Sequence, residues 1–142
     1  MGGDLKFNDD DFAEPGDDQI QWSAILATGN TAKDGTAGTS LLFTADASRG
    51  SYIRAIVAKP IGTNIQTVLR IFVNNGQDPT VAANNFYFKD YTLPATTLSE
   101  TAGQPESEFA INTGLPPGYR LYAVLGTTVA AGWTVGALAG KR

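Results

Sequence analysis

The sequence predicts an all-β protein, an antiparallel β-sandwich of jelly-roll-like form with about eight strands and an extended N-terminal arm. Two observations predict this class. No stretch of about eleven residues keeps apolar positions at helical spacing without an interrupting Gly or Pro. Short segments instead alternate apolar and polar residues, and turn signals rich in Gly, Pro, Asn and Asp separate them roughly every 8–15 residues. We expect antiparallel pairing, because a parallel sheet needs crossover helices that this pattern lacks.

Residues 65–74, with the sequence IQTVLRIFVN, are the clearest predicted strand. The odd-numbered positions, Leu69 and Ile71 among them, are apolar or β-branched and fall on one face. Gln66 and Arg70 fall on the other face. Such alternation is typical of a strand that buries one side.

The other strands are predicted by the same alternation between turn signals. They are expected at residues 22–28, 39–45, 51–59, 85–93, 108–112, 119–126 and 133–138. Strict alternation places Leu41 and Phe43 together facing the core, and likewise Ile53 and Val57.

Composition excludes several kinds of chemistry. The 142 residues include no His and no Cys, so imidazole bases, thiol nucleophiles and thiolate or histidine metal sites are ruled out. No apolar run is long enough to span a membrane, and the acidic first residues do not form a signal peptide. We expect a protein that binds or builds rather than an enzyme, with no catalytic, cofactor or metal site.

Acidic residues gather at the start of the sequence. Residues 1–18 hold seven acidic residues and one base, whereas the rest of the chain is nearly neutral. We therefore divide the chain into an acidic arm, residues 1–20, and a sandwich body, residues 21–142. Such a block is either a solvated tail or an arm that docks on a basic partner, and it argues against nucleic acid because phosphates repel it. The residues predicted to contact a partner are Phe7, Asp9, Asp10, Asp11, Phe12 and Ile20.

Other clusters offer weaker chemistry. The aspartates of the arm lack the spacing of a calcium-binding loop. Glu100, Glu106 and Glu108 lie in a polar stretch, and their spacing does not define a glycosidase pair. Trp22, Trp133 and the tyrosines are suited either to core packing or to stacking on sugars. Glycan binding therefore remains an alternative.

The body carries few charges for a free monomer. Residues 19–142 hold 16 charged side chains, and several strands are apolar on both faces. An outer face of this kind is usually covered by another chain. We expect a homo-oligomer, a dimer or trimer, docked on a larger assembly.

Four segments also resemble a known class of proteins. They are TGNTAKDGTAGTSLLFTA, SRGSYIRAIVAKPIGTNIQTVLRIFVNNG, FYFKDYTLPATTLSETA and LPPGYRLYAVLGTTVAAGW. Together they are similar to small virion proteins of tailed bacteriophages of the head decoration, or cement, type. The resemblance covers about residues 22–138.

This resemblance implies a jelly-roll-like sandwich without catalysis. It implies a structural role on the outer surface of the virion capsid, reached after synthesis in the host cytoplasm, with the major capsid protein as partner. The alternative is a glycan- or host-binding β-sandwich module of a head fibre or tail. We expect neither nucleic acid nor a membrane as partner.

Overall fold

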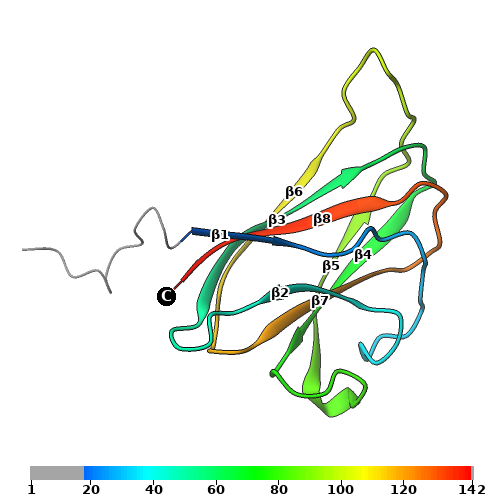
Figure 1. The fold of residues 1–142 in the computed structure, drawn as a ribbon. Helices are drawn as coiled ribbons and strands as arrows, with labels where there is room; N and C mark the ends of the chain where they lie inside the picture. The colour runs from blue at the N-terminus through cyan, green and yellow to red at the C-terminus, as the bar shows by residue number, and fades with distance from the viewer. Residues whose placement is uncertain (1–17, 142) are drawn as a thin grey trace, which may run out of the picture.

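The computed structural model describes residues 18–141, and these form eight β-strands in two four-stranded sheets (Figure 1). The strands are β1 (Asp18–Trp22), β2 (Ser40–Thr44), β3 (Ser51–Pro60), β4 (Thr67–Asn74), β5 (Asn85–Leu93), β6 (Ser107–Leu115), β7 (Arg120–Leu125) and β8 (Trp133–Lys141). A short 3-10 turn, η2 (Ala82–Asn84), precedes β5. Every strand pair is antiparallel. The prediction of an antiparallel β-sandwich with about eight strands is confirmed.

The strand order is that of a long hairpin rolled into two layers. Sheet A has the order β1-β8-β3-β6 and sheet B the order β2-β7-β4-β5. The first strand therefore pairs with the eighth, the second with the seventh, the third with the sixth and the fourth with the fifth. Consecutive strands lie in opposite sheets except β4 and β5, which form the tip of the hairpin. Partners that are far apart in the sequence thus lie side by side in both sheets.

The core fills the space between the two inner faces. Trp133, Phe43, Leu69 and Ile71 are among its largest side chains, and each is fully buried. Trp133 also joins β8 to the chain that follows β1, because its backbone exchanges hydrogen bonds of 2.8 and 2.9 Å with Leu26. Burying an aliphatic or aromatic side chain of this size contributes about 1.5–3 kcal/mol each.

A β-bulge in β2 reverses the expected facing of its side chains. The register with β7 shifts between Leu41 and Phe43. Leu42 and Phe43 are consequently both buried, whereas Leu41 is 46% exposed. The prediction that Leu41 faces the core is wrong, because strict alternation fails where one strand carries an extra residue.

A second bulge, in β3, lies between Ile53 and Ala55. Ile53 and Ile56 point into the core, and Val57 lies on the outer face, only half buried. The prediction that Val57 shares a face with Ile53 is wrong for the same reason. The extra residue is Arg54, which is exposed on the outside of sheet A.

The first strand begins earlier than predicted. Of residues 22–28, only Trp22 belongs to a strand, as the last residue of β1, and Leu26 forms an isolated bridge with Trp133. Gln21 holds β1 against the opposite sheet: its side-chain amide donates to the Thr44 carbonyl at 3.1 Å and accepts from the Thr44 amide at 2.9 Å. The polar side chain of Gln21 points inward and satisfies backbone groups of the opposite sheet. A search for alternating apolar residues therefore misses the inner face of β1. Residues 18–20, assigned to the arm from the sequence, belong to β1.

Asn64 connects three loops at one end of the sandwich. Its side chain is 4% exposed. The Oδ1 atom accepts hydrogen bonds from the amides of Ala131 and Gly132 at 2.9 and 2.8 Å. Its Nδ2 group donates to the Gly132 carbonyl and to the Thr96 hydroxyl at 3.1 and 3.3 Å. One amide side chain therefore satisfies buried groups from the β5–β6 and β7–β8 connections.

Asn64→Ala should lower the free energy of unfolding by roughly 2–4 kcal/mol, because each buried donor left unpaired costs about 1–3 kcal/mol. Urea denaturation followed by circular dichroism measures this. Gln66→Ala, at an exposed position of the same loop, is the matched control and should change stability by no more than about 0.5 kcal/mol. Equal stability of the two variants would contradict the role assigned to Asn64.

Three aspartates close turns by accepting hydrogen bonds from the residues that follow them. Asp46 accepts from the backbone amide of Arg49 at 2.9 Å and from the hydroxyl of Ser48 at 3.1 Å. These donors lower the pKa of Asp46 below its ordinary value of 3.8, the Arg49 amide most strongly. The pKa values of Asp34 and Asp78 are lowered in the same way, by the amides and hydroxyls of Thr36 and Thr80.

A carboxylate whose pKa is lowered by folding stabilises the fold above its unfolded-state pKa. This stabilisation should be lost as the pH falls from 3.8 through the lower pKa of the folded state. Asp46→Asn should therefore weaken the dependence of stability on pH in this acidic range. Thermal unfolding of both proteins across the range tests this, and identical acid profiles would contradict it.

Candidate functional site

Part of the outer face of sheet B, around Phe72 of β4, is covered by the chain itself. The loop before β2, residues 29–39, lies over β4, where the side chain of Phe72 is only 1% exposed. The side chain of Asn85 donates to the Asp34 carbonyl at 3.1 Å, and Arg70 donates to the Asn30 carbonyl at 3.2 Å. A Cβ atom at Gly35 would lie 3.1 Å from the Phe72 ring, so the loop packs closely. This loop keeps a partner from contacting Phe72 and the middle of β4.

Sheet A instead presents apolar side chains to solvent. Ile20 and Trp22 alternate along β1 with the inward-facing Gln21, and they are 60% and 71% exposed. Tyr52 of β3 is 44% exposed on the same sheet. An exposed tryptophan beside an exposed isoleucine is unusual for a free surface and is typical of a contact surface.

Strand β8, which pairs with β1 at the edge of sheet A, makes this face flat. Residues directly opposite in neighbouring strands share a face, so Ile20 lies beside Leu138 of β8, and Trp22 lies beside Gly136. Further along β8, Gly140 lies opposite Asp18. The two glycines have no side chains to separate a partner from the sheet. We call the surface formed by Ile20, Trp22, Tyr52, Gly136, Leu138 and Gly140 the sheet A face.

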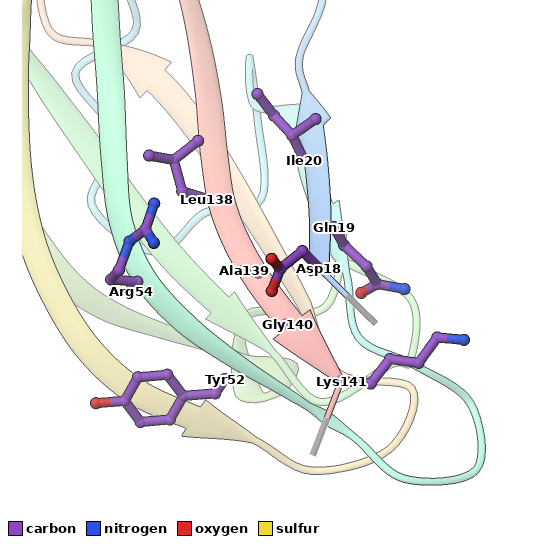
Figure 2. A pocket seen from close by; sticks show the side chains of 9 residues that line it. All are labelled: Asp18, Gln19, Ile20, Tyr52, Arg54, Leu138, Ala139, Gly140 and Lys141. Carbon is purple, nitrogen blue, oxygen red and sulfur yellow. The ribbon is translucent and has the colours of Figure 1, made fainter. Parts of the chain in front are cut away.

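A hollow of about 490 Å³ lies at one end of the sheet A face (Figure 2). Gly140 of β8 lies at its middle, Asp18 and Ile20 of β1 lie on one side, and Tyr52 and Arg54 of β3 lie on the other. Its lining is mainly apolar, with one carboxylate from Asp18 and cationic side chains from Arg54 and Lys141. Such a hollow suits an apolar or aromatic group that carries negative charge nearby.

Other exposed apolar side chains lie singly on sheet B, as Leu41 of β2 and Phe86 of β5, and on loops at the Asn64 end. Ile61 and Ile65 flank the Asn64 loop, and Leu98 follows in the β5–β6 connection, where its amide donates to the Thr63 hydroxyl at 2.9 Å. These side chains come from separate loops, whereas those of the sheet A face are fixed by strand pairing. The sheet A face is therefore the better-organised contact surface.

Only one of the predicted contact residues lies within the described part of the chain. Ile20 is in β1 on the sheet A face. Phe7, Asp9, Asp10, Asp11 and Phe12 lie outside the described residues.

The sequence analysis did not assign Arg54 or Leu138 to a site, and it named Trp22 and the tyrosines only as side chains suited to core packing or to stacking on sugars. The alternation of residues 18–22 and the small residues around Leu138 were the available signals.

Comparison with protein-family models, with curated proteins and with solved structures found no match. Among residues 18–141, no three acidic side chains gather closely enough to hold a metal ion. No helix in this part of the chain is long and apolar enough to cross a membrane.

Trp22 should dominate quenching of tryptophan fluorescence by acrylamide. It is 71% exposed, whereas Trp133, the other tryptophan, is completely buried. Trp22→Phe should remove most of the quenchable emission and leave a quencher-resistant signal from Trp133. If wild type and variant are quenched to the same extent, Trp22 does not lie on an open face.

Proposed function

We propose that this protein is a non-enzymatic virion structural protein that decorates the outside of a tailed-phage capsid and docks through the sheet A face. The observation that carries the proposal is the exposed pair Ile20 and Trp22 beside the flat, glycine-containing strand β8. Aromatic side chains in flat apolar patches supply much of the binding energy of protein interfaces. The partner is the major capsid protein, and the site of action is the outer surface of the virion.

The fold agrees with this proposal. We interpret the strand order as a jelly roll, an architecture of eight strands in two Greek keys that recurs in capsid proteins. The resemblance of about residues 22–138 to head decoration proteins points in the same direction. A decoration protein needs no reactive pocket, because a repeated lattice of weak contacts gains strength through effective concentration.

The acidic arm and self-association belong to the same proposal. Phe7, Phe12 and the three aspartates between them would contact the capsid shell or a sister subunit. A dimer or trimer would bury more of the apolar surface than a monomer and would match the symmetry of capsid sites.

Binding of glycans is the second candidate, and the exposure of Trp22 favours it. A tryptophan ring on an open face can stack on a sugar, as aromatic rings do in many recognition sites. In this case the protein would belong to a head fibre or tail and would bind the host surface.

Trp22→Ser and Ile20→Ser should each lower occupancy on capsids of the encoding virus by about tenfold or more, the effect of losing a central interface residue. Leu98→Ser, at a 50% exposed position on the β5–β6 loop, is the control and should leave occupancy unchanged. Occupancy is measured by mass spectrometry of capsids re-isolated after incubation with each protein.

Loss with Leu98→Ser but not with Trp22→Ser would place docking on the loop end and contradict the proposed surface. Absence of wild-type protein from the capsids, combined with Trp22-dependent binding to a glycan array, would replace decoration with the second candidate.

A further inference from the structure

We propose that two copies of this chain pair along the free edges of their β1 strands, antiparallel about a two-fold axis, so that their A sheets join into one continuous sheet. The proposal deepens the self-association that belongs to the proposed function, because it names the surface and limits the assembly to a dimer. The pairing itself does not depend on capsid binding. Three features of β1 support it: the direction of its backbone groups, its lack of edge protection and its self-complementary side chains.

The free backbone groups of β1 point away from the sheet. In the part of the chain that the structure describes, β1 is the outermost strand of sheet A. Just after it, the amide of Ser23 donates to the carbonyl of Val135 at 3.0 Å, in the register that pairs β1 with β8. Backbone groups alternate in direction along a strand, so those of Gln21 also face β8. The N–H and C=O groups of Ile20 and Trp22 therefore face the open edge.

The other edge strands carry features that hinder pairing with another chain. Each of β2, β5 and β6 is interrupted by a β-bulge, and a bulge twists an edge away from a straight partner. The bulge of β6 includes Asn112, which has a left-handed φ of 51°. β5 adds the exposed charges of Lys89 and Asp90. On β2, the side chain of Gln21 already binds the amide and the carbonyl of Thr44.

Strand β1 lacks these features. It pairs with β8 residue for residue, without a register shift, from Asp18 to Trp22. It contains no proline and no lysine, and its one charged residue, Asp18, stands at its start. Ile20 and Trp22 are 60% and 71% exposed. A regular, apolar and open edge of this kind is a template for the addition of another strand.

The side chains of β1 complement those of a second β1 strand. A two-fold axis beside Gln21 sets Ile20 of each copy opposite Trp22 of the other. Because the backbone groups of both residues face the edge, each such pair exchanges N–H···O bonds in both directions. A β-branched side chain opposite an aromatic one is a favourable cross-strand pair. Asp18 lies opposite Ala24 in this register, so no like charges face each other. The occupant that fits this edge is therefore a second copy of the chain.

Pairing through the backbone edge keeps the sheet A face open. Ile20 and Trp22 still project from the outer side of the joined sheet, and each copy keeps its hollow around Gly140 (Figure 2). The two sheet A faces then lie side by side. If the proposed function holds, one dimer presents two linked contact surfaces to the capsid, and the second contact gains from effective concentration.

Amide hydrogen exchange of the full chain, measured by NMR over a range of protein concentrations, tests the pairing directly. The amides of Ile20 and Trp22 should exchange about tenfold more slowly, or slower still, where the protein is dimeric than where it is monomeric. The amide of Gln21 faces β8 and should be protected at every concentration. Sedimentation velocity gives the dimer fraction at each concentration.

Three results of these measurements would overturn the pairing. The first is a dimer in which the amides of Ile20 and Trp22 exchange as fast as in the monomer, because its copies would then meet through another surface. The second is protection of these amides that does not depend on concentration. The third is a wild-type protein that forms trimers, or that stays monomeric up to about 1 mM.

A pair of matched variants tests the side chains. Ile20→Glu removes one apolar partner and adds a carboxylate beside Asp18, so it should raise the Kd of the dimer by about tenfold or more. Leu41→Glu changes a 46% exposed aliphatic residue on the edge strand β2, and it should leave the Kd unchanged. Circular dichroism verifies that both variants are folded. An equal effect of the two substitutions would overturn the assigned edge.

These measurements use the free protein, so failure of the pairing and failure of the proposed function are distinguishable. A wild-type protein that stays monomeric yet occupies capsids would overturn the pairing and leave the decoration function standing. If the exchange and sedimentation results hold but the dimer does not bind capsids, the pairing stands and the decoration function fails.

Discussion

Sheet A depends on the insertion of its last strand between two earlier ones. β8 lies between β1 and β3 and pairs with both, so neither neighbour has its full set of sheet hydrogen bonds until the end of the chain is in place. Trp133 begins this strand inside the core, and its backbone is bonded to Leu26. The fold is therefore closed by contacts between distant parts of the sequence, which slows folding relative to locally paired structures.

The same strand also forms the candidate site. Its inner residues, such as Val135 and Ala137, are buried, and its outer positions carry Gly136, Leu138 and Gly140. The alternation that fills the core thus leaves a flat outer surface with a hollow at Gly140. The two sheets differ in their cover: residues 29–39 lie over Phe72 on sheet B, whereas Ile20 and Trp22 on sheet A remain open to solvent.

Much of the fold could be predicted from the sequence because apolar alternation and turn residues are local signals. The strand predicted at residues 85–93 matches β5 in both bounds, and residues 65–74 contain β4. The errors arise where a single extra residue changes the facing of a strand, as at Leu41 and Val57. β1 was placed too late because Gln21 uses its inner position for hydrogen bonds to Thr44, a contact that no local pattern reveals.

Less of the candidate site could be predicted. Ile20 was selected for its position in an acidic arm, and Trp22 follows it on the same face of β1, but Leu138 is brought beside Ile20 only by the pairing of β1 with β8. Alternation along residues 51–59 places Tyr52 and Arg54 on one face, as observed, but the sequence does not show that β8 brings Leu138 and Gly140 beside them. Residues 29–39 fold over Phe72 of sheet B and leave the sheet A face open. This contact joins residues far apart in the sequence, so local patterns do not predict it.

A cryo-electron microscopy reconstruction of capsids incubated with the protein tests the central claim most directly. The account predicts a sandwich on the outer shell with the sheet A face toward the capsid protein and Trp22 buried in the contact. A sandwich bound through the loop end around Leu98, with Trp22 in solvent, would contradict it, as would a shell without added density.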